Sequence, residues 1–117
     1  MRSALVISEN TPETPELASM LEFARANNWS IVSLCTVFNA ELVQVLMDRR
    51  VQNIYFAGNE AQAFATVSAG YSFRTYFLLD LWKTKGSRDD RRDILKFLRE
   101  NLVITTTTRE VQRFRLI

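Results

Sequence analysis

The sequence contains no histidine. Histidine is the commonest general base near neutral pH and the commonest metal ligand in proteins. Its absence excludes a Ser-His-Asp triad, a histidine-ligated zinc hydrolase and a histidine phosphotransfer site. The single cysteine, Cys35, excludes an internal disulfide, and its place in the apolar run IVSLCTV predicts a buried structural thiol.

Glycine is scarce as well. The only glycines are Gly58, Gly70 and Gly86, so the sequence contains neither the glycine-rich motif of dinucleotide-binding domains nor that of a P-loop. Classical binding of NAD or ATP is therefore disfavoured, and we expect no cofactor.

Long apolar runs are also lacking. No stretch approaches the 18 or more apolar residues that a membrane span requires, so we expect no membrane association. The start MRSALVIS has too short an apolar stretch for a secretory signal and no small-residue cleavage site after it. These features predict a cytoplasmic protein.

Charge is present but unevenly placed. Ten of the 15 basic residues, and only five of the 13 acidic ones, lie in residues 83–117. A cationic segment of this kind is typical of surfaces that bind nucleic acid or an acidic partner, because clustered Lys and Arg contact phosphates.

Short apolar runs alternate with helical patterns through the first 70 residues. We predict strands at residues 5–7, 29–37 and 53–57, and helices at 14–27, 39 to about 51 and 60–70, with Gly70 ending the last of these. Such alternation is typical of a parallel sheet covered by helices on both faces. The predicted fold is a single α/β domain over residues 1–117, with three layers and an open, mostly parallel sheet of flavodoxin-like or resolvase-like type.

The remaining residues are harder to assign. The alternation within residues 71–82 favours a strand at about 73–79, although the apolar density of this segment also allows a helix. A helix is predicted from 88 to about 101, with Ile94, Leu95, Leu98 and Leu102 as its buried stripe. The end of the chain, LVITTTTREVQRFRLI, is β-branched and then alternates, which predicts one or two strands.

In open α/β sheets, ligands bind beyond the carboxyl ends of the strands. The polar residues expected there are the ligand-binding candidates Ser8, Glu9, Asn10, Thr11, Asn39, Asn59 and Glu60. The alternative is that these are ordinary connecting loops, which are polar in most proteins of this class. No carboxylate spacing favours a metal site, so none is predicted.

The cationic segment supplies a second set of candidates. Those for binding nucleic acid are Lys83, Lys85, Arg88, Arg92, Arg109, Arg113 and Arg115. Aspartates interleave them, so salt bridges at i, i+3 and i, i+4 along a solvated helix are the alternative. Trp82 and Tyr76 lie in a segment so apolar that it favours a subunit interface, and hence a homo-oligomer.

The order of the first 58 residues resembles the N-terminal catalytic domain of serine recombinases, the resolvase and invertase family. The matching pieces are ALVIS, ELASMLEFARANNWSIVSL, AELVQVLMDRR and VQNIYFAG. By this resemblance Ser8 corresponds to the nucleophile that attacks a DNA phosphate. The family has an arginine where this chain has Val6, and an Asp-Arg motif where this chain has GNEA from Gly58. The resemblance therefore implies a catalytically silent relative.

From these observations we predict a non-catalytic α/β protein that takes part in a DNA-related process. It would do so through its cationic C-terminal third and through self-association. One alternative is a nucleotide-binding or small-ligand-binding domain that uses the loops after the first three strands. The other is a protein-interaction module.

Overall fold

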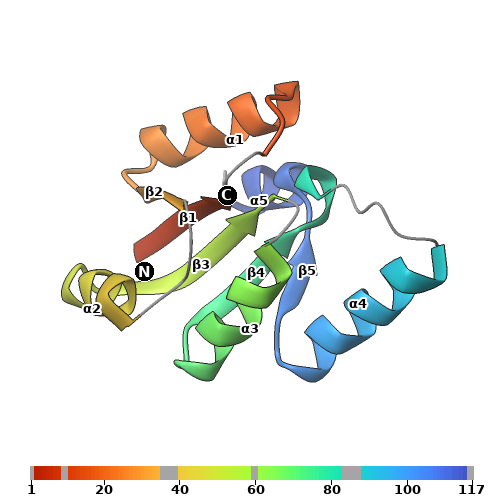
Figure 1. Cartoon of the computed structure of the whole chain (residues 1–117). Coiled ribbons are helices and arrows are strands. Elements are labelled where there is room, and N and C mark those ends of the chain that lie inside the picture. The colour runs from red at the N-terminus through yellow and green to blue at the C-terminus, as the bar shows by residue number, and fades with distance from the viewer. Residues whose placement is uncertain (1, 9–10, 35–39, 59–60, 83–87, 116–117) are drawn as a thin grey trace.

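The chain folds around one sheet of five parallel strands in the order β2-β1-β3-β4-β5 (Figure 1). The computed structural model describes residues 2–8, 11–34, 40–58, 61–82 and 88–115. Helices α1 and α5 lie on one side of the sheet, and α2, α3 and α4 lie on the other (Figure 1). The predicted three-layer α/β fold is therefore confirmed, and the strand order is the one found in flavodoxin-like proteins.

The elements follow one another in strict β-α alternation apart from one short 3₁₀ turn. The strands are β1 (Arg2–Ser8), β2 (Ser30–Leu34), β3 (Val51–Ala57), β4 (Arg74–Leu78) and β5 (Ile104–Thr106). The helices are α1 (Pro15–Ala26), α2 (Ala40–Asp48), α3 (Ala61–Gly70), α4 (Arg88–Glu100) and α5 (Thr108–Arg115), with the 3₁₀ turn η1 (Leu79–Leu81) after β4. In the described part of the chain, no helix is both long and apolar enough to cross a membrane.

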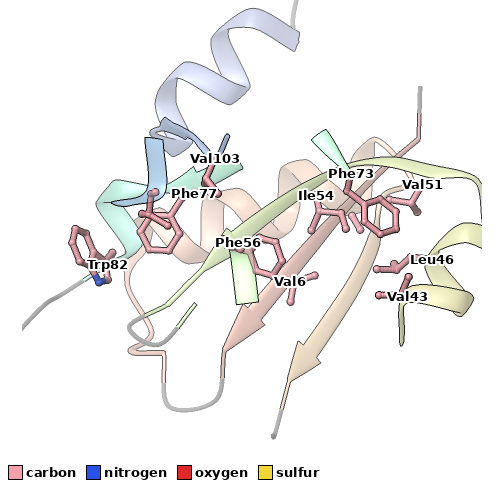
Figure 2. Close-up of a cluster of buried hydrophobic side chains, with 13 residues drawn as sticks. Val6, Val43, Leu46, Val51, Ile54, Phe56, Phe73, Phe77, Trp82 and Val103 are labelled. Atoms are coloured by element: carbon pink, nitrogen blue, oxygen red, sulfur yellow. The ribbon is translucent and has the colours of Figure 1, made fainter. Parts of the chain in front are cut away.

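The central strands are buried on both faces because helices cover each side. Alternate residues of β1 point to opposite faces: Val6 joins the core under α2, α3 and α4, whereas Leu5 joins the core under α1 and α5. The first core runs from Val43 and Leu46 of α2 across the sheet to Phe77 and Trp82 (Figure 2). The second holds a stack of three aromatic rings, Trp29, Tyr55 and Tyr76, with centroids 4.7 Å and 4.5 Å apart.

Helix α1 begins as the sequence predicts. Thr14 is the N-cap and accepts a hydrogen bond from the backbone N–H of Leu17, and Pro15 occupies the first helical position, where its missing N–H costs nothing. Leu17, Met20 and Ala24 form the buried stripe against the sheet.

Four helices end in the same turn, in which the second residue after the helix has a positive φ. These residues are Asn28, Arg50, Ser72 and Leu102, with φ of 59°, 58°, 70° and 66°. At the end of α4, for example, the Val103 N–H bonds to the Leu98 carbonyl and the Leu102 N–H to the Arg99 carbonyl, which is the Schellman pattern. Glycine is the usual residue at that position, yet none of the four is glycine.

This turn overturns three expectations from the sequence. Gly70 is the last residue of α3 rather than its terminator, because Ser72 takes the left-handed conformation. Helix α2 ends at Asp48, and Val51 already belongs to β3. Leu102 is 81% exposed instead of buried, since it lies in the turn beyond α4 and no longer follows the helical stripe.

The end of the chain differs most from expectation. One short strand, β5, forms as predicted, but residues 108–115 are the helix α5 and not a second strand. Thr107 and Glu110 carry the Thr-x-x-Glu spacing of a capping box, and the Glu110 N–H donates to Thr107 Oγ1 at 3.2 Å. This helix-start signal competes with the β-branched composition and decides the local structure.

The positive φ of Ser72 gives a stability prediction. A left-handed conformation costs an ordinary L-residue about 1–2 kcal/mol in the folded state, and glycine avoids this cost. A glycine variant also has a more flexible unfolded chain, which lowers its free energy of unfolding by about 0.4–1 kcal/mol and so cancels part of the gain. Ser72→Gly should therefore raise the free energy of unfolding by about 0.5–1 kcal/mol, measured by urea denaturation. Asn28→Gly is the matched control and should change it by only a few tenths, because asparagine already tolerates this conformation. A loss of stability in Ser72→Gly would contradict this account of the turn.

Candidate functional site

The carboxyl ends of β1 and β3 meet beside the point where the strand order reverses, since β1 lies between β2 and β3. This is the place where doubly wound α/β sheets hold their ligands. Ser8 is the last residue of β1, Gly58 follows β3, and Thr11 lies in the loop that leads from β1 to α1.

These three residues are packed tightly against one another. The hydroxyl oxygens of Ser8 and Thr11 are 3.1 Å apart, and Thr11 Oγ1 also donates to the Ser8 carbonyl at 2.7 Å. Gly58 has a φ of 113°, and a Cβ placed on it would lie 1.9 Å from Ser8 Oγ and 2.2 Å from Thr11 Oγ1. Glycine is required here for both space and backbone conformation.

The chemistry available to Ser8 follows from this packing. Its side chain is only 5% exposed, and its hydroxyl is hydrogen-bonded to Thr11. Two residues earlier, where serine recombinases have an arginine, Val6 is fully buried in the core under α2, α3 and α4. Val6 carries no charge, so this position offers none to stabilise an attacked phosphate.

A second contact ties β4 to α5 at the same edge. Asp80, in the turn η1, accepts a hydrogen bond from the Thr108 N–H at 3.0 Å and a second from the Thr108 hydroxyl. An acidic side chain at a helix N-terminus is stabilised by the helix dipole. Asp80 therefore acts as a cap at the start of α5. Separately, the described residues contain no group of three or more Cys, Asp or Glu side chains that could hold a metal ion.

Between α1 and α5 the surface is hollowed over about 320 Å³. Glu16 and Ser19 of α1 face Arg109 and Gln112 of α5 across it, and Ser19 and Gln112 are joined by side-chain hydrogen bonds. A carboxylate and a guanidinium line the same small, open hollow, so its net charge does not favour one sign of ligand.

The structure brings together only part of the predicted ligand set. Ser8 and Thr11 are in contact, as described above. The other five candidates lie outside the described residues, namely Glu9, Asn10, Asn39, Asn59 and Glu60. Sequence reasoning did not single out the contact between Gly58 and the first loop, although a glycine directly after a buried strand is a signal of close backbone approach.

The basic candidates are divided between two helices on opposite sides of the sheet. Arg88 and Arg92 are exposed on α4, and Arg109 and Arg113 are exposed on α5. The side chain of Arg115, and the whole of Lys83 and Lys85, lie outside the described residues. On α4, Lys96 and Glu100 form an ion pair at 4.0 Å, and the described side chains of Arg88, Arg92 and Arg99 make no ion pair. Of the salt bridges in the alternative prediction, the described residues of α4 thus form one, at Lys96 and Glu100, and none at these three arginines.

The two aromatic residues expected at a subunit interface differ in their burial. Trp82 is 4% exposed, packs edge-on against Phe77, and lies beneath the guanidinium of Arg91 at 5.3 Å. Tyr76 is half-buried in the aromatic stack. The exposed apolar side chains lie elsewhere, with Phe97 at 52%, Leu102 at 81% and Ile104 at 46% around the end of α4 and the edge strand β5.

Comparison with known proteins gives a likeness in fold. No family model matches the chain, and no curated relative was found. The solved structure of MAR1 ribonuclease from Caenorhabditis elegans is similar over 95% of this chain and 79% of that one, with a TM-score of 0.70 and 15% sequence identity. At that identity the likeness shows a shared fold alone. It does not bear on the predicted resemblance to serine recombinases.

The Gly58 contact gives a second stability prediction. Gly58→Ala should destabilise the protein by at least about 2 kcal/mol, because the new Cβ overlaps two hydroxyls and the positive φ adds strain. Removing both hydroxyls with Ser8→Ala and Thr11→Ala in the same chain should restore part of that loss. Chemical denaturation of the single, double and triple variants measures the coupling. Additive effects would mean that the three residues do not contact one another.

Proposed function

We propose that this protein binds nucleic acid without catalysing a reaction on it, and that it takes part in a DNA-related process. The observation that carries the proposal is the row of arginines on α4 that make no ion pair among the described side chains. Arginines left without carboxylate partners on a helix flank are available to phosphates, to which a guanidinium donates two parallel hydrogen bonds.

The spacing of these arginines supports an extended anionic partner. Arg88, Arg92 and Arg99 recur at i, i+4 and i+11, which places them on one flank of α4. With a rise of about 1.5 Å per residue, the flank is about 16 Å long, and duplex DNA carries one charge per about 1.7 Å of its axis. One helix flank therefore fits several consecutive phosphates. Arg109 and Arg113 of α5 add positive charge on the other side of the sheet.

One further observation supports nucleic acid as the partner, and another supports the absence of catalysis. A solved structure with the same fold is that of a protein named a ribonuclease, which is why we propose nucleic acid as the partner of this chain. The groups that cleavage needs are harder to find here, because the chain has no histidine and Ser8 Oγ is buried against Thr11. The same geometry supports the proposal that any kinship with serine recombinases is catalytically silent.

The basic flank predicts binding that depends steeply on salt. Replacing Arg92 and Arg99 by alanine should weaken binding to a DNA or RNA oligonucleotide and lower the slope of log K against log salt by up to about 2 units, because each lost phosphate contact removes about 0.7–0.9. Fluorescence anisotropy over a series of salt concentrations measures both quantities. Parallel titrations with DNA and RNA decide which nucleic acid is preferred.

The matched control is the double variant Arg25→Ala and Arg74→Ala, which removes the same charge from exposed positions on α1 and β4. It should leave the slope within about half a unit of the wild type. If both double variants lose the same affinity, the effect comes from net charge alone and not from the flank of α4. If the wild-type protein does not bind either oligonucleotide at low salt, the proposal is refuted. Cleavage of either oligonucleotide would refute its non-catalytic part.

We also propose that the protein self-associates, and that it does so through one edge of the sheet. Strand β5 is three residues long and has no partner strand on its outer side in the described sheet, and it carries no charge, proline or bulge. Phe97, Leu102 and Ile104 are exposed around it. A second copy paired edge to edge through β5 would cover both the unpaired backbone and these side chains, which is why we propose a second copy as the occupant.

Leu102→Asn tests this surface. Asparagine tolerates the positive φ of Leu102, so the monomer should be at least as stable, whereas the dissociation constant of the dimer should rise at least about tenfold because an apolar side chain is lost from each copy. Sedimentation equilibrium measures the change. Val45→Asn, which alters a side chain of α2 that is 43% exposed, is the control and should have no effect. A wild-type protein that stays monomeric at high concentration would refute the surface.

The two other predicted functions stay as alternatives. A ligand site at the carboxyl edge would use the loops of which Ser8 and Thr11 are the described part, and a protein-interaction module would need neither ligand nor nucleic acid. The cytoplasm is the location we propose for each of them.

A further inference from the structure

A cavity of about 410 Å³ lies at the edge of the sheet opposite the predicted ligand site, where the strands begin. The starts of β1, β2 and β3 form it together with the turns that follow α1 and α2. Its main polar side chains are Arg2, Arg49, Asn27, Asn28 and Ser30, with Trp29 and Val51 as apolar parts of the wall. The volume lies within the range of small-molecule pockets.

The charges around this cavity are of one sign. Arg2 and Arg49 are both among its lining residues, and no aspartate or glutamate is. Like charges that share a cavity repel one another unless an anion lies between them. Arg2 donates one hydrogen bond to the Arg49 carbonyl at 3.2 Å, which leaves four of its five N–H groups for other acceptors.

Helices α1 and α2 both end beside the cavity, and the negative end of a helix dipole disfavours an anion. Here several carbonyls at or just after the two helix ends are already hydrogen-bonded. The Trp29 N–H bonds to the Ala24 carbonyl, the Arg50 N–H to the Met47 carbonyl, and Arg2 to the Arg49 carbonyl. The positive charges of Arg2 and Arg49, and the unused N–H groups of Arg2, therefore favour an anion at this cavity.

We propose that this cavity binds a small organic phosphate of about mononucleotide size. A guanidinium pair recognises the phosphate oxygens, and the amide and hydroxyl groups of Asn28 and Ser30 provide donors and acceptors for the rest of the molecule. An inorganic phosphate would fill only part of 410 Å³, which is why the proposal commits to a phosphate ester. The inference does not rest on the nucleic-acid function, because its residues are separate from those of α4.

Isothermal titration calorimetry tests the proposal with four probes, namely orthophosphate, ribose 5-phosphate, adenosine 5′-monophosphate and adenosine. We expect the two phosphate esters to bind more tightly than orthophosphate, and adenosine not to bind. Arg49→Ala should weaken ester binding at least about tenfold, because it removes one guanidinium and keeps the carbonyl that Arg2 contacts.

Arg50→Ala is the matched control. It changes the neighbouring arginine, which lines a different cavity with Tyr71 and Phe73, and it should keep ester binding within about twofold. The Arg92→Ala, Arg99→Ala variant should also keep it, which separates this cavity from the flank of α4. Arg2→Gln is a second test at the same cavity should Arg49→Ala perturb the fold.

The proposal is overturned if no phosphate ester binds the wild-type protein at millimolar concentration. It is also overturned if adenosine binds as well as its monophosphate, or if Arg50→Ala loses as much affinity as Arg49→Ala. Loss of ester binding in Arg49→Ala or in Arg2→Gln, with retention in Arg50→Ala, supports it.

Discussion

Burial of the central strands on both faces is the constraint on which the rest of this structure depends. Val6 and Phe56 contribute to one core, and Leu5 and Tyr55 to the other, so β1 and β3 need helices on each side. Parallel strands also require a crossover after each strand, and a helix supplies both the connection and the cover. The helices thus lie on the faces of the sheet, and the loops are confined to its two edges.

The two edges have different chemistry. At the carboxyl edge, the hydroxyls of Ser8 and Thr11 bond to each other beside Gly58, and Asp80 bonds to Thr108, so the described polar groups hold the loops together. At the amino edge, left-handed turns end the helices, and two arginines line one cavity that has no acidic residue in its lining. Groups whose hydrogen bonds are used internally favour rigidity, whereas unused donors favour a ligand, which is why the proposed phosphate site lies at the edge where the strands begin.

Much of the fold could be predicted because the relevant signals are local. The Thr14-Pro15 helix start and the stripe of Leu17, Met20 and Ala24 depend on residues close in sequence, and both are confirmed. The errors arose where two local signals compete. The β-branched threonines before α5 favour a strand, but the Thr107–Glu110 capping box starts a helix, and Asp80, 28 residues away from Thr108, stabilises it from another loop.

The candidate sites were less predictable because they depend on side chains that are distant in sequence. The sequence alone determined the alternation of strands and helices, the absence of histidine chemistry, and the concentration of positive charge in the last third. Only the tertiary structure decided that Leu102 is exposed, that Trp82 is buried under Arg91, and that Arg2 and Arg49 share one cavity. The physical reason is that periodicity specifies which side of an element is apolar, whereas the partner of a side chain across the fold is specified by strand order and helix ends.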